Sequence, residues 1–246
     1  MKTIKILGFC FFLLASFIYQ SQEELSADMK NVIQLLQINS DNVDRDLSIE
    51  KPMRHLPEIM AYAVLEKVGK SDYAEEGHYK YKCHVVLYNA SDKIITNRYV
   101  IENLESDAVR LSKVSFDFAP YMVQSNKRAF GLRISYSGAS RVNPYEEEKL
   151  TLFVQEKDKL VPVLNDFTSY LSTGDWDTNC AGEFNEKRAI FILEPTSSNG
   201  FFDMKVNYKD IKTINKPVSG DCKGTETVTK SSSKLVYVNG TYQVKK

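Results

Sequence analysis

Runs in which apolar and polar residues alternate recur along this chain from position 79 to its end. In residues 202–208, Phe, Met, Val and Tyr alternate with Asp, Lys and Asn. Successive side chains of a β-strand point to opposite faces, so a period of two is typical of strands that bury one face. Further runs at 79–88, 94–101, 130–136 and 150–154 predict more strands. The chain is therefore expected to fold mainly as β-sheet.

Turn signals between these runs predict antiparallel pairing. Asn239-Gly240 separates two strand runs, and Asn-Gly is the strongest short signal of a β-hairpin. The regular alternation of strands and helices that a parallel sheet requires is absent from the sequence. We therefore expect about ten strands in antiparallel sheets, arranged as a partial propeller or a sandwich, with one short N-terminal helix.

Individual residues refine the expected positions of these strands. Pro120 is expected to end its strand, and Gly131 to mark a bulge or a close approach of two backbones. Pro162 suggests an edge position for the strand at 160–164. The run 189–193 is apolar on both sides, which suggests a central strand. Residues 209–233 are polar and are expected to form turns.

Residues 1–21 have the pattern of a secretory signal peptide. Lys2 and Lys5 precede an uncharged apolar stretch at 6–19, which is too short for a comfortable membrane span. An uncleaved N-terminal anchor is the alternative interpretation. We expect a secreted or periplasmic protein with no transmembrane segment in the mature chain.

The next segment, 22–54, is predicted to hold a helix and a linker. Ser26 can cap a helix over 26–38, in which apolar residues recur at helical spacing: Leu25, Met29, Val32 and Leu36. This helix is expected either to pack on the edge of the sheet or to bind a partner. Residues 39–54 are polar and acidic without an apolar period, so they are interpreted as a linker before an antiparallel β domain at 55–246.

Composition and motifs favour binding over catalysis. The formal net charge is +0, whereas a nucleic-acid binder needs a basic face. The sequence contains no nucleophile-elbow, zinc-protease or phosphate-loop motif. No cofactor is predicted, apart from the calcium ion considered below.

Removal of residues 1–21 leaves three cysteines. Cys83 lies in an alternating strand run, on the same face as tyrosine and valine, and is expected to be buried. Cys180 and Cys222 both lie in turn-like stretches near glycine. A secreted chain permits a disulfide, so we predict a Cys180–Cys222 bridge.

The loop at 174–183 carries the most suggestive set of polar residues. Five oxygen-bearing side chains stand at relative positions 1, 3, 5, 9 and 12, as in a calcium-binding loop: Asp175, Asp177, Asn179, Glu183 and Glu186. Cys180, however, takes the position where the sharp turn of such a loop requires glycine. The alternative is a solvated acidic loop that a disulfide holds in place.

Trp176, the only tryptophan, lies in the same loop. An exposed tryptophan beside the carboxylates of Asp175 and Asp177 could stack on a sugar ring or anchor a partner. The alternative is that Trp176 packs on the core.

The run from Asn199 to Val206 resembles the core of the FG-GAP or VCBS-type β-propeller repeat. The shared features are a turn with Gly200, then Asp203 and a valine strand, and the aromatic hairpin at 237–242 is similar to one that often follows in such secreted proteins. The resemblance implies a blade-like β unit. The family's acidic calcium ligands are replaced here by a Pro-Thr-Ser-Ser run, which leaves Asn199 and Asp203 as the only candidates.

Together these observations predict a secreted or periplasmic, non-enzymatic protein that binds an unidentified envelope or extracellular protein. The alternative is a hydrolase of envelope polysaccharide that uses a pair of carboxylates near Trp176. A structural envelope component that self-associates through a strand edge is a third hypothesis.

Overall fold

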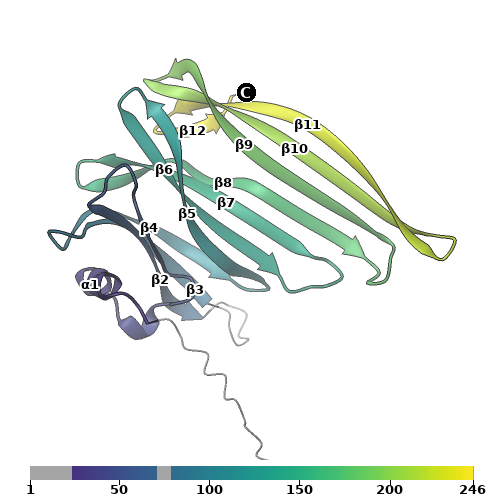
Figure 1. The fold of residues 1–246 in the computed structure, drawn as a ribbon, viewed down its shortest axis with the longest axis horizontal. Helices are drawn as coiled ribbons and strands as arrows, with labels where there is room; N and C mark the ends of the chain where they lie inside the picture. Colours follow the sequence, from purple (N-terminus) through teal and green to yellow (C-terminus); the bar gives the residue numbers. More distant parts are fainter. Residues whose placement is uncertain (1–23, 71–78, 246) are drawn as a thin grey trace, which may run out of the picture.

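The computed structural model describes residues 24–70 and 79–245 (Figure 1). The expected signal peptide lies outside the described residues. Helix α1 (Ala27–Leu35) and a short 3-10 helix (Ser40–Asn42) precede the strands. The strands are β1 (Ile49–Pro52), β2 (Ile59–Lys70), β3 (Tyr79–Asn89), β4 (Ile94–Ser106), β5 (Val109–Gln124), β6 (Lys127–Gly138), β7 (Tyr145–Glu156), β8 (Lys159–Trp176), β9 (Gly182–Ser198), β10 (Phe201–Val218), β11 (Asp221–Val238) and β12 (Thr241–Val244).

The twelve strands form one sheet, almost entirely antiparallel, which confirms the predicted fold class. Each strand pairs with the next along the chain except β4 and β5. One parallel pair, Arg98 with Lys159, connects β4 to β8. The strands are continuous with one another rather than grouped into separate blades (Figure 1).

Each end of the sheet shares a core with the middle strands. One cluster joins β2 and β3 to β5, β6 and β7, and includes Leu65, Cys83, Phe130 and Phe153. A second cluster joins residues 150–154 of β7 and 163–164 of β8 to β10, β11 and β12. The first of these clusters is the packing that the sandwich alternative expected, because two layers of one sheet face each other across it.

Helix α1 begins where the sequence predicts. The Ser26 hydroxyl accepts a hydrogen bond from the Met29 backbone N–H at 2.9 Å, as a helix N-cap does. The helix buries Met29, Val32 and Ile33 against Tyr62, Val64, Val86 and Tyr88. It therefore covers a face of β2 and β3 rather than the edge of the sheet. The segment expected as a linker contains β1, whose residues pair with β2.

The prediction that Pro120 ends its strand is wrong. Strand β5 continues to Gln124, and its register with β6 shifts between Asp117 and Tyr121. A bulge of this kind accommodates a proline, which has no N–H to donate to the ladder. Pro162 lies opposite Phe153 of β7, whereas β9 pairs with β8 only from Tyr170 onward, so the outer side of Pro162 is locally unpaired as predicted.

The space beside Gly131 is occupied by side chains of two neighbouring strands, and not by a neighbouring backbone as one alternative predicted. A Cβ atom at Gly131 would lie 2.8 Å from Leu150 Cδ1 and 3.0 Å from Asp117 Cβ. Asp117 is also the partner of Gly131 across the β5–β6 ladder. The absence of a side chain at this position therefore leaves room for the Asp117 carboxyl group.

Residues 209–233 form strand rather than the predicted turns. Strands β10 and β11 pair without interruption from Met204–Leu235 to Val218–Asp221, around a two-residue turn. Every residue from 221 to 232 is exposed, so this part of the hairpin carries no apolar alternation that would predict strands. The hairpin extends beyond the body of the sheet, with β11 as its outermost strand (Figure 1).

A polar groove across strands β5 to β10

A row of cross-strand partners crosses six neighbouring strands of the sheet. Each residue of the row is the register partner of the next on the adjacent strand. The row consists of Lys113, Ser135, Glu148, Tyr170, Arg188 and Lys209. All six line a groove of about 900 Å³. The groove is therefore a product of the sheet register, because residues distant in sequence meet only through the ladder.

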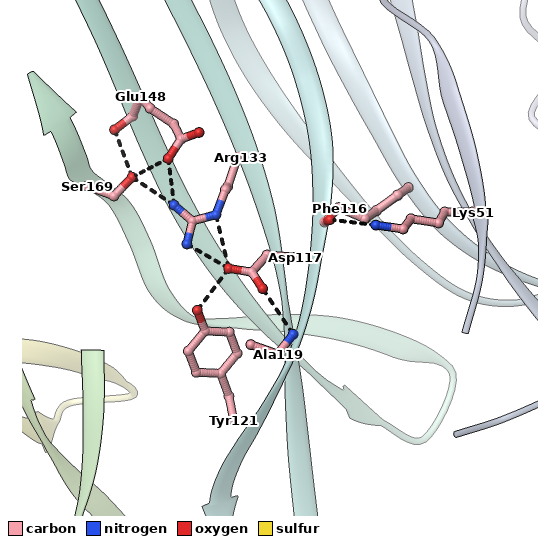
Figure 2. Close-up of polar contacts among 8 residues, drawn as sticks. All are labelled: Lys51, Phe116, Asp117, Ala119, Tyr121, Arg133, Glu148 and Ser169. Carbon is pink, nitrogen blue, oxygen red and sulfur yellow. Dashed lines mark hydrogen bonds and ion pairs between the residues drawn. The ribbon is translucent and has the colours of Figure 1, made fainter. Parts of the chain in front are cut away.

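Arg133 of β6 is the centre of the polar contacts at the floor of this groove (Figure 2). Its guanidinium donates to Asp117 Oδ2 at 2.6 and 3.0 Å and to Glu148 Oε1 at 2.5 Å. It also donates to Ser169 Oγ at 3.1 Å, and Ser169 in turn donates to Glu148 at 2.8 Å. The side chains of Arg133 and Asp117 are 24% and 16% exposed, so the pair is largely withdrawn from solvent.

The β5 bulge supplies two further donors to Asp117 (Figure 2). The Tyr121 hydroxyl donates to Asp117 Oδ2 at 2.8 Å, and the Ala119 N–H donates to Oδ1 at 3.0 Å. The register shift between Asp117 and Tyr121 brings the Tyr121 hydroxyl to the carboxylate. The irregularity around Pro120 thus helps to hold the network beneath the groove.

These contacts fix the protonation states of the network. Burial alone would raise the pKa of Asp117, but hydrogen bonds from Ala119, Arg133 and Tyr121 outweigh it and lower this pKa below its usual value. Burial would likewise lower the pKa of Arg133, but its hydrogen bonds to Asp117 and Glu148 raise this pKa instead. Both groups stay charged through the neutral pH range.

The other end of the groove is cationic and partly apolar. The Arg188 guanidinium lies 5.4 Å from the centre of the Tyr170 ring and pairs with Glu186 at 2.6 Å. Lys209 is the next residue of the row. Ile190, which also lines the groove, is 63% exposed, and Ile192 on the same face is 45% exposed. Glu146, Glu147 and Glu148 of β7 line the middle of the groove, and Glu146 is exposed, while Lys113 of β5 lies at the opposite end.

The predicted site at Trp176 lies outside this groove, at the end of β8. The Trp176 indole N–H donates to the Arg141 carbonyl oxygen, and its ring packs at 6.2 Å from the Phe184 ring. Asp175 accepts a hydrogen bond from the Asn143 side chain at 3.3 Å. Trp176 is half-buried and therefore serves the packing of the loop. The hydrolase alternative, which uses a carboxylate pair near this residue, stays a prediction.

Four of the five candidate calcium ligands, Asp175, Asp177, Glu183 and Glu186, are directed to different partners. Asp177 accepts from the N–H groups of Asn179 and Cys180 and so caps the turn of its own loop. Glu183 pairs with Lys212 at 2.6 Å, and Glu186 pairs with Arg188. Within the described residues, no three His, Cys, Asp or Glu side chains are grouped so that they can hold a metal ion. The spacing of this loop therefore serves a turn and two ion pairs.

The predicted disulfide is present. Cys180 and Cys222 are joined with a Cα–Cα distance of 5.6 Å. The bond connects the β8–β9 loop to the tip of the β10–β11 hairpin. Cys83 is fully buried, as predicted, and is free, and burial raises its pKa to about 12. The Cys83 thiol is therefore not an available nucleophile at neutral pH.

Asp203, one of the two residues left by the propeller resemblance, is buried. Its carboxylate accepts from Thr196 and Ser198, both at 2.7 Å, and pairs with Lys234 at 2.9 Å. The Asn199 side chain donates to the Tyr237 carbonyl oxygen at 2.7 Å. These contacts connect the β9–β10 turn to β11.

Comparison of the chain with protein families, with curated proteins and with solved structures finds no match. Within the described residues, no helix has the length and apolar character needed to cross a bilayer. The groove is therefore interpreted from its own residues.

Proposed function

We propose that this chain is a non-enzymatic, secreted or periplasmic protein that binds a segment of another envelope or extracellular protein in the β5–β10 groove. The observation that carries the proposal is the combination of a shallow polar groove with exposed isoleucine at its cationic end. Exposed apolar side chains that charged residues surround are typical of surfaces that take a partner.

The groove indicates the chemistry of the partner. Ile190 and Ile192 offer an apolar contact, while Arg188 and Lys209 favour a carboxylate beside it. The exposed Glu146 of β7, in the middle of the groove, favours a cation. A protein segment with an apolar side chain between an acidic and a basic residue satisfies all three groups.

The fixed charges of the network support binding rather than turnover. General acid–base catalysis works best with a group whose pKa lies near the working pH. The pKa of Asp117 is shifted down and that of Arg133 is shifted up, so each pKa lies further from neutral pH than its ordinary value does. A permanently charged, hydrogen-bonded floor instead offers a rigid surface for recognition.

The proposed compartment rests on two features of the chain. The N-terminal apolar stretch after Lys2 and Lys5 has the pattern of a secretory signal. The Cys180–Cys222 bond belongs to the type of linkage that persists in oxidising compartments.

Changing Ile190 to aspartate is expected to weaken partner binding at least about tenfold, because an apolar side chain that the bound partner would cover becomes a charge that must be desolvated. The measurement is affinity capture from the extracytoplasmic fraction of the producing cells, quantified by mass spectrometry. Wild-type protein is expected to retain one protein in stoichiometric amount. Ile190→Asp is expected to lose it.

The matched control is Ile94→Asp. Ile94 is also a strand isoleucine, 51% exposed, but it begins β4, outside the groove. The control is expected to retain the partner as wild type does. Equal retention by both variants would show that the groove is not the binding surface. A wild-type protein that retains nothing would contradict a stable protein partner.

A further inference from the structure

Strand β11 has a long outer edge that no described strand covers. Strand β12 pairs only with residues 235–238 of β11, and β10 occupies the opposite side. Within residues 24–70 and 79–245, the outer edge from Cys222 to Ser233 therefore has no strand partner. A free edge of this length can take another strand by backbone hydrogen bonding.

The register of the hairpin determines which residues of β11 point outward. Val218 and Asp221 flank a two-residue turn, and such a pair exchanges its backbone hydrogen bonds across the hairpin. The backbone N–H and C=O groups of Asp221 therefore point toward β10. Because these groups point to alternate sides along a strand, the even-numbered residues of β11 present theirs to the free side. The contact from Lys245 N–H to the Lys234 carbonyl oxygen, at 2.8 Å, agrees with this assignment.

From these positions we infer that two copies of this chain pair antiparallel through their β11 edges, about a two-fold axis at Val228. In this register Val228 faces Val228 of the second copy, with outward N–H and C=O groups matched on both strands. Glu226 then lies opposite Lys230 of the second copy, and Lys230 lies opposite its Glu226. Thr227 similarly faces Thr229, a favourable cross-strand pair.

The sequence of the edge selects this register over its neighbours. An axis at Glu226 would oppose the two copies of Glu226, and an axis at Lys230 would oppose two lysines. Axes at Thr227 or Thr229 would pair Glu226 with no lysine. Among the axes from Glu226 to Lys230, only the axis at Val228 gives two opposite-charge pairs without opposing like charges. Val228 also lies at the centre of the free edge, midway between Cys222 and Lys234.

The properties of Lys230 and Val228 support the same pairing. Lys230 lies opposite Lys209 within its own chain, so an acidic partner on its other side relieves repulsion between like charges. The Val228 side chain is 44% exposed and gains an apolar neighbour at the axis. The Cys180–Cys222 bond holds the tip of the hairpin and so keeps the edge extended. Lys230 adjoins the cationic end of the proposed groove through Lys209, but neither Val228 nor Lys230 lines that groove.

The test is a charge exchange measured by sedimentation velocity of the purified protein across a range of concentrations. Wild type is expected to form dimers. Glu226→Lys alone and Lys230→Glu alone place like charges opposite each other twice, and each is expected to weaken dimerisation at least about tenfold. The double variant, which carries both changes, restores both pairs and is expected to dimerise as wild type does.

An equimolar mixture of the two single variants provides a second readout. Each lysine of one variant then faces a glutamate of the other, so heterodimers are expected where neither variant dimerises alone. Both positions are exposed, so thermal unfolding of each variant should match wild type at low concentration. A wild-type protein that stays monomeric at high micromolar concentration overturns the inference. A dimer that the single variants leave intact, or that the double variant fails to restore, overturns it too.

Discussion

Replacing Arg133 with methionine lowers the free energy of unfolding by about 3 kcal/mol in our account, because it leaves Asp117 and Glu148 largely buried without their common partner. Methionine keeps the length and most of the volume of the arginine stem, so the loss reports the charge rather than a cavity. The measurement is urea denaturation at neutral pH, followed by circular dichroism.

The matched control is Arg188→Met. Arg188 also pairs with a glutamate, but its side chain is 60% exposed, and exposed ion pairs contribute at most about 1 kcal/mol. Equal losses for the two variants would show that the Arg133 network does not stabilise the sheet.

The pH dependence gives a second readout for Arg133. The folded-state pKa of Asp117 is below its ordinary value of 3.8, so the contribution of its negative charge is complete above that value. It is lost as the pH falls through the folded-state pKa. The stability difference between wild type and Arg133→Met should therefore narrow as the pH falls below 3.8. A difference that stays constant on acidification would contradict the role assigned to Asp117.

Removing the disulfide with the double variant Cys180→Ser and Cys222→Ser is expected to lower the free energy of unfolding by about 4 kcal/mol. The bond closes a loop over a sequence separation of 42, and the chain-entropy treatment of such a loop gives this magnitude. The measurement is guanidinium denaturation without reductant.

The effect should also be local. Amide hydrogen exchange is expected to accelerate most at the tip of the β10–β11 hairpin, which the bond ties to the β8–β9 loop. Wild type treated with reductant is the control and should unfold as the double variant does. If reductant leaves the wild-type midpoint unchanged, the bond does not stabilise the fold.

The parts of the fold that were predictable from sequence are those with a local signal. Alternation located β3, β6 and β7, Asn239-Gly240 located the β11–β12 hairpin, and Ser26 located the start of α1. Each signal acts within a few residues of the structure that it specifies. The disulfide followed from a small number of cysteines, one of which lay in a buried strand pattern.

The extension of β10 and β11 could not be predicted in this way. The β11 segment 221–232 is exposed throughout, so the pairing is specified by β-branched residues and the turn rather than by burial. The prediction that Pro120 ends its strand failed for a related reason, since a bulge accommodates the proline and β5 continues beyond it. In both cases the tertiary context outweighed the local pattern.

The groove was missed because its residues come from six strands and have no common sequence motif. The available signal was Arg133 itself, a charge set between Leu132 and Ile134 in an apolar strand run. That signal predicts a partly buried cation that needs partners. It does not identify Asp117 and Glu148, because the sheet register alone brings them together.

The most direct test of the proposed binding function is site-specific photo-crosslinking in the producing cells. A photoreactive phenylalanine analogue at position 190 lies in the groove, and the same group at position 94 lies outside it. We expect one discrete adduct with another protein from position 190 and none from position 94. Adducts of equal yield from both positions, or none from position 190, would contradict the proposed function.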